Sequence, residues 1–224
     1  MQSILSVLKV NINPRVYVKD PESSDLGRKI IEHSILLMEE IGFDNFNFKK
    51  LGERISSNES SIYRYFENKH KLLVYLSSWY WGWIEYRLVF STANISDPLE
   101  RLKNAIRVVT QTVEDDAVTN FVNEAVLNKI VIAEFTKTLH TKEVDDENKE
   151  GFFLIYKSVI NRIVALVKEV NPDYPYAKSL VSTVVEGALH QQFLKDHLKT
   201  ITNIGPAVST TDFYTHLMLK ALDK

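Results

Sequence analysis

The segment that decides the fold reads FKKLGERISSNESSIYRYF and runs from Phe48 to Phe66. Its first part, residues 48–55, has the apolar spacing of a helix, and the Ser-Ser-Asn sequence at 56–58 is typical of a turn. A second short helix, capped within that turn, is expected to continue through Tyr65. Two short helices joined by a tight turn predict a helix-turn-helix, whose second helix can enter the major groove of DNA.

The composition of the 224-residue chain excludes several classes of protein. A formal net charge of −2 argues against a polybasic protein, and the absence of cysteine excludes disulfides and thiolate chemistry. No apolar stretch reaches the roughly 18 residues that a membrane span requires. The first residues lack a basic region and a cleavage site, so we expect a cytoplasmic protein that does not bind membranes.

Apolar spacing on both sides of the segment predicts an all-α fold. One helix is expected from Asp25 to Gly42, and the charged run 141–150 is expected to be a solvated loop. Further helices are predicted over 68–90, 98–113, 118–140, 152–170, 176–198 and 211–222. We therefore expect three parts: an N-terminal arm (1–24) with short strands or extended chain, a helix-turn-helix domain (25–70), and a helical domain for effector binding and dimerisation (71–224).

Two motifs in this region resemble a known family. The run SIYRYFENKHKL, Ser61 to Leu72, is similar to Thr-Leu-Tyr-x-His-Phe-x-x-Lys-x-x-Leu, and EIGF, Glu40 to Phe43, is similar to Glu-x-Gly-aromatic. Both are signatures of the DNA-binding domain of the TetR family of bacterial transcriptional regulators, which residues 25–72 therefore resemble. The resemblance implies a sequence-specific regulator, expected to be a homodimeric repressor that binds a palindromic operator in double-stranded DNA and is released by a small apolar ligand.

The resemblance also implies which side chains contact DNA. Tyr63 and Lys69 occupy positions that hold phosphates, and Arg64 is a candidate for reading guanine. Residues 47–71 carry six basic and three acidic side chains, which supports this interpretation weakly. The complete set expected at the DNA interface is Asn47, Lys49, Lys50, Asn58, Ser60, Ser61, Tyr63, Arg64, Tyr65 and Lys69.

An aromatic stripe marks the helix predicted over 68–90. Trp79, Trp83, Tyr86 and Phe90 recur at helical spacing. Such a stripe is typical of a core between helices, and the family resemblance adds a second interpretation, the wall of a pocket for a small apolar effector.

The helices predicted over 152–170 and 176–198 carry broad apolar faces. Given the resemblance, we expect these faces to form a two-fold interface between two copies of the chain. The residues expected there are Val159, Ile163, Leu180, Val184, Val185 and Ala188.

Catalytic and metal-binding patterns are weak. Glu186, His190 and His197 lie near one another on a predicted helix, but their spacing does not keep all three on one face. We expect no enzyme activity, no metal site and no cofactor. Two alternatives stay open: a helical ligand-binding or scaffold protein that has lost DNA recognition, suggested by Glu59 where the family has Lys or Pro, and an α-helical enzyme.

Overall fold

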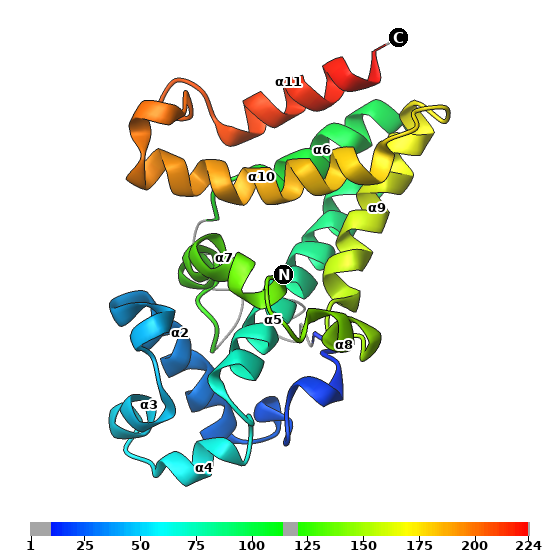
Figure 1. The fold of residues 1–224 in the computed structure, drawn as a ribbon. Helices are drawn as coiled ribbons and strands as arrows, with labels where there is room; N and C mark the ends of the chain where they lie inside the picture. The colour runs from blue at the N-terminus through cyan, green and yellow to red at the C-terminus, as the bar shows by residue number, and fades with distance from the viewer. Residues whose placement is uncertain (1–9, 114–120, 224) are drawn as a thin grey trace. The chain divides into compact units, whose positions relative to one another are not determined.

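The computed structural model describes residues 10–113 and 121–223 (Figure 1). Over these residues the chain is predominantly helical and has no strand, which confirms the all-α prediction. The α-helices are α2 (Asp25–Asn45), α3 (Phe48–Arg54), α4 (Glu59–Tyr63), α5 (Lys69–Thr92), α6 (Pro98–Thr110), α7 (Glu124–Leu139), α8 (Val144–Lys149), α9 (Leu154–Val170), α10 (Ala177–His197) and α11 (Thr210–Leu222). Within these ranges, no helix is both long and apolar enough to cross a membrane.

The chain packs as two units, and each is described by itself. The first comprises the described residues up to Gly82 and those between Val113 and Leu154, and the second comprises 83–112 and the described residues from Ile155 onward. The functional boundary expected near residue 70 stays a prediction. The two units divide within α5, between Gly82 and Trp83. The predicted helix over 118–140 corresponds to α7, and its first residues, 118–120, lie outside the described part.

The N-terminal arm begins the first unit, and its described residues form two 3-10 turns and no strand, so the first of the two expectations, short strands, is wrong. The turns are η1 (Pro14–Val16) and η2 (Pro21–Ser23), and each starts with a proline, whose ring fixes a helix-like φ. Asn13 caps the first through the Arg15 amide, and Asp20 caps the second through the Glu22 amide. The β-forming side chains of Ile12 and Val16 are buried, so they anchor the arm to the core of the unit.

Local chemistry explains the first three helices. The Ser24 hydroxyl caps α2, and Gly42 interrupts its helical backbone at φ 73°, close to the stop that the sequence predicted. The Asn47 side chain accepts from the Lys50 amide at 2.9 Å and caps α3. Gly52 lies within α3 against the turn that follows it, and a Cβ atom there would lie 2.7 Å from the Ser57 carbonyl oxygen, so only glycine fits without movement. Ser56 takes a left-handed backbone conformation, φ 53°, in the same turn.

Two further helices complete the first unit. α7 packs on α2, with Lys129 bonded to Glu39 at 3.0 Å and Lys137 bonded to Asp44 at 2.9 Å. The run 141–150, predicted to be a loop, contains the short helix α8. The prediction was wrong because one of its acidic residues is not solvated: Glu147 is buried and lies 3.0 Å from the His70 ring nitrogen Nε2.

The second unit contains α6, α9, α10, α11 and the end of α5. α10 packs on both α6 and α11, and α9 is joined to α5 by Ser158, which donates to Glu85 at 2.6 Å. This packing contradicts the predicted dimer interface. The residues expected there are at most 1% exposed within one chain, except for the half-buried Leu180; they are Val159, Ile163, Val184, Val185 and Ala188. Their apolar faces form the core of a single chain, so they are not available to a second copy.

Candidate nucleic-acid interface

Helices α3 and α4 form a helix-turn-helix in the first unit. Leu51, Ile62 and Phe66 are fully buried and hold the two helices against the rest of the unit. Ser24, Asn47 and Asn58 lie at the starts of α2, α3 and α4, although Asn58 makes no side-chain capping bond. The inner face of α4 is therefore held by buried side chains, while its outer face lies at the surface.

The outer face of α4 carries most of the side chains expected to contact DNA. Tyr63 is 48% exposed, and its ring is held edge-on by Phe48 at 5.0 Å between centroids. Arg64 ends the helix and is exposed, and Ser61 is half-buried. The other exposed members of the expected set are Asn47, Lys49, Lys50, Asn58 and Ser60. The structure thus brings hydroxyl, amide and cationic groups together on one surface, where they can hydrogen-bond to phosphates and base edges.

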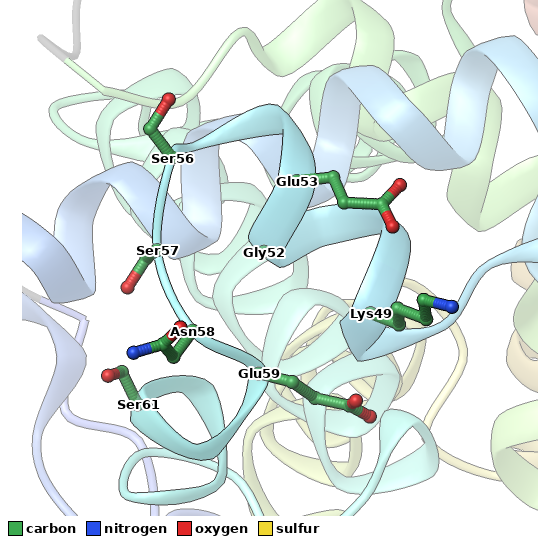
Figure 2. A pocket seen from close by; sticks show the side chains of 8 residues that line it. All are labelled: Lys49, Gly52, Glu53, Ser56, Ser57, Asn58, Glu59 and Ser61. Carbon is green, nitrogen blue, oxygen red and sulfur yellow. The ribbon is translucent and has the colours of Figure 1, made fainter.

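A hollow of about 490 Å³ lies at the turn between α3 and α4. Its lining residues are Lys49, Gly52, Glu53, Ser56, Ser57, Asn58, Glu59 and Ser61. In Figure 2 the side chains of Lys49, Glu53 and Glu59 extend to one side of the helices, and those of Ser57, Asn58 and Ser61 extend to the other. The side with Ser57, Asn58 and Ser61 is therefore polar and uncharged. The other side carries the Lys49 cation and two carboxylates, and the carboxylates would repel phosphates.

The structure corrects the expected role of Tyr65. This residue is only 4% exposed, and its hydroxyl is hydrogen-bonded to the Ser24 hydroxyl at 2.8 Å. The backbone carbonyl of Tyr65 accepts from the Val18 amide at 2.8 Å, so the N-terminal arm covers this end of α4. A buried ring cannot reach a base edge, and the prediction that Tyr65 contacts DNA is wrong.

Lys69 is also placed differently from the expectation. Its ammonium group donates to three backbone carbonyls, those of Phe43 at 3.0 Å and of Asp44 and Phe46 at 3.1 Å. It also lies 4.7 Å from the centroid of the Phe43 ring. Lys69 therefore neutralises the carbonyl end of α2 and the link that follows it, which is a structural role, instead of presenting a cation to phosphate.

Ion pairs reduce the positive charge of the same region. Arg54 makes two bonds to Glu40, at 2.6 and 2.8 Å, and these hydrogen bonds hold the pKa of the Glu40 carboxyl below its usual range. The hydrogen bond from Lys137 likewise lowers the pKa of Asp44. The cations on the outer face of the helix-turn-helix that make no ion pair with another described residue are Lys49, Lys50 and Arg64, and of these the Lys50 ammonium donates to the Asn45 carbonyl at 2.9 Å.

The aromatic stripe of α5 is divided between the two units. Trp79 lies in the first and is buried, and Trp83, Tyr86 and Phe90 lie in the second. Trp83 is buried beneath the Arg87 guanidinium, whereas Phe90 is 62% exposed and lies 4.4 Å from Tyr86 between ring centroids. The burial of both tryptophans agrees with their interpretation as core, and a ligand pocket stays a prediction.

A comparison with protein families decides what this helix-turn-helix is. Residues 30–76 match the model of the bacterial regulatory proteins of the tetR family. The helix-turn-helix domain belongs to the TetR family. The match contains α3, α4 and the first turns of α5, and it confirms the resemblance inferred from the sequence motifs. Among curated protein sequences, no match to the chain was found.

Solved structures extend the likeness beyond the TetR-family domain. The regulator PfmR from Thermus thermophilus is 13% identical with a TM-score of 0.57, covering 87% of this chain and 99% of PfmR. AibR, solved with isovaleryl coenzyme A and operator DNA, is 14% identical with a TM-score of 0.56, covering 85% and 96%. The superantigen PfiT is 16% identical with a TM-score of 0.58, covering 90% and 97%. At these identities the likeness shows a shared fold.

Proposed function

We propose that the protein is a sequence-specific DNA-binding regulator of transcription that represses by occupying a palindromic operator. The observation that carries this proposal is the TetR-family helix-turn-helix, with Ser60, Tyr63 and Arg64 on the open face of α4. A short helix with exposed polar side chains is the element that reads base edges in the major groove. The protein would therefore act in the cytoplasm, where the DNA of a bacterium lies, and no catalytic role is proposed.

The test is selection of bound sites from random duplexes at defined salt. A palindromic consensus is expected, because a symmetric pair of helices reads two matching half-sites. Arg64→Ala should then relax the preference at one position of each half-site, at a cost of about 1–3 kcal/mol there. The matched control is Arg107→Ala, which removes an exposed arginine of α6 in the second unit. Failure to select any sequence would refute specific recognition.

We infer that the repressor acts as a homodimer through a surface different from the one predicted. Within the second unit, α11 keeps Phe213 and Leu217 exposed one helical turn apart, 41% and 37% exposed. A second copy packed on this face would cover both side chains. Leu217→Glu should therefore shift sedimentation from dimer to monomer, and Lys199→Glu, on the exposed turn after α10, should not. A wild-type chain that binds its operator as a monomer would contradict the inference.

We further propose that a small apolar ligand releases the DNA. α5 (Lys69–Thr92) is the next helix after α4 in the chain. A ligand bound beside Trp83 and Tyr86 would therefore contact the same helix that follows the DNA-binding element. Tryptophan fluorescence can follow a titration with a library of small apolar compounds, carried out with and without the operator. Ligand and operator should weaken each other equally, by about 5- to 150-fold. A bound compound that leaves operator affinity unchanged would refute release.

A second candidate function is a helical binding protein without specific DNA recognition. The observation in its favour is the pair of carboxylates, Glu53 and Glu59, beside Lys49 at the turn. The superantigen PfiT has a related fold, so the architecture also occurs in a protein whose described role is not regulation. The selection experiment separates the two candidates, because the second predicts no enriched sequence.

A further inference from the structure

The N-terminal arm lies against the end of the helix expected to read DNA. Its residues 17–19 belong to the dark blue part of the chain in Figure 1, and the Val18 amide donates to the Tyr65 carbonyl at 2.8 Å. The Val18 side chain is 58% exposed, so this part of the arm lies at the surface beside α4. The arm therefore forms part of the same face of the first unit as the end of α4.

The arm is held in this place by contacts on both sides. Upstream, Ile12 and Val16 are buried, and the Asn13 amide donates to the Glu150 carbonyl at 2.7 Å. Downstream, the Tyr75 hydroxyl donates to Glu22 at 3.2 Å, and burial raises the pKa of that tyrosine. These contacts fix the position of the arm before any DNA binds, so a side chain on it needs little ordering to make a contact.

Lys19 is the exposed cation of this part of the arm. Its ammonium nitrogen lies 3.5 Å from the Tyr65 hydroxyl and 5.2 Å from the centroid of that ring. Within 10–113 and 121–223, the contacts of the Lys19 ammonium are those with Tyr65, and the neighbouring Asp20 carboxylate accepts from the Glu22 amide at 2.9 Å. The Lys19 ammonium thus lies over Tyr65, the residue predicted from sequence to contact DNA.

We propose that Lys19 binds a backbone phosphate of DNA beside the end of α4, taking the contact that the buried Tyr65 cannot make. The inference rests on the proposed DNA-binding function. A phosphate is the expected partner, because lysine acts as a compact point charge and its position is at the carboxyl end of α4, whereas base edges are read mainly from the amino end of a recognition helix. The arm is then a second element of the DNA interface.

The test compares Lys19→Gln with Lys199→Gln, which removes the same charge from the second unit. Binding of the selected duplex and of a scrambled duplex is measured by fluorescence anisotropy over a series of salt concentrations. Lys19→Gln should weaken both duplexes by a similar factor and lower the slope of log affinity against log salt by about 0.9, the loss of one phosphate contact. Lys19→Arg should restore the slope, and Lys199→Gln should leave it unchanged.

The outcomes separate this inference from the function on which it rests. Because Tyr65 stays bonded to Ser24 and only the exposed contact of Lys19 with its ring is lost, the unfolding midpoint of Lys19→Gln should stay close to that of the wild type. If the wild type selects a palindrome and Lys19→Gln keeps the wild-type slope, the role of Lys19 is refuted and DNA binding stands. A wild type that binds no duplex overturns both.

Discussion

Replacement of Lys69 by alanine should destabilise the first unit and leave the number of phosphate contacts unchanged. In the wild type its ammonium group donates to the carbonyls of Phe43, Asp44 and Phe46. The Asp44 bond is exposed, so that carbonyl can turn to water in the variant. The Phe43 and Phe46 bonds are partly buried, and those two acceptors lose a charged donor that water replaces poorly.

The magnitude follows from these contacts. A hydrogen bond to a charged group contributes about 1.5–3 kcal/mol, and the lower value applies to each of the two partly buried bonds. The position of the ammonium over the Phe43 ring, 4.7 Å from its centroid, adds about 0.5–1 kcal/mol. We therefore expect the free energy of unfolding to fall by about 3.5–4 kcal/mol, a large part of the 5–15 kcal/mol typical of a domain.

Urea unfolding followed by circular dichroism measures this change, with Lys29→Ala, an exposed lysine of α2, as the matched control. The control should stay within about 0.5 kcal/mol of the wild type. A salt titration of DNA binding completes the test, because a structural lysine leaves the salt slope unaltered. If Lys69→Ala keeps wild-type stability and loses about one unit of slope, the ammonium leaves the carbonyls to bind phosphate and the reasoning is wrong.

Three further predictions concern other positions. Glu59→Gln should raise operator affinity severalfold by removing a carboxylate from the DNA-facing hollow; an unchanged or weaker affinity at low salt would show that this carboxylate does not face phosphates. Val185→Ala should cost about 2 kcal/mol of stability at every protein concentration, since Val185 is buried within one chain; a loss that shrinks at high concentration would place it in an interface instead. The hydrogen bond from Lys137 lowers the pKa of Asp44, so this carboxylate stabilises the fold above about pH 4, and the stabilisation is lost as the pH falls through the lowered pKa. The difference in unfolding midpoint between the wild type and Asp44→Asn should therefore vanish in acid. A difference that grows in acid would contradict the assignment.

The sequence predicted the helices well because their signals are local. Asn47 caps α3, Asp97 and Pro98 begin α6, and the family motif identifies the helix-turn-helix, each within a few residues of chain. Apolar periodicity was less informative about partners. It indicates that the face containing Val184 and Val185 is buried, but the same pattern results whether that face packs within one chain or against a second copy.

The misplaced contacts depended on residues far away in the chain. Tyr65 is covered by Val18 and Ser24, more than forty positions earlier, and the carbonyls that hold Lys69 come from the end of α2. The helix in the run 141–150 likewise depends on the contact between Glu147 and His70. The residues of α4 and α5 themselves do not indicate which distant segments pack on them. The chemistry of each side chain was therefore predictable from sequence, and its exposure to solvent was not.

The turn between α3 and α4 has a consequence for how this protein tolerates sequence change. Gly52 meets the backbone of Ser57 so closely that every other residue would have to push the turn apart, whereas Ser56 holds a left-handed conformation that costs a non-glycine residue about 1–2 kcal/mol. A saturation library would therefore show opposite profiles at two nearby sites, with Gly52 intolerant of all substitutions and Ser56 enriched in glycine and asparagine. Substitution to glycine is therefore expected to be tolerated at Ser56, whereas substitution away from glycine is expected to be rejected at Gly52.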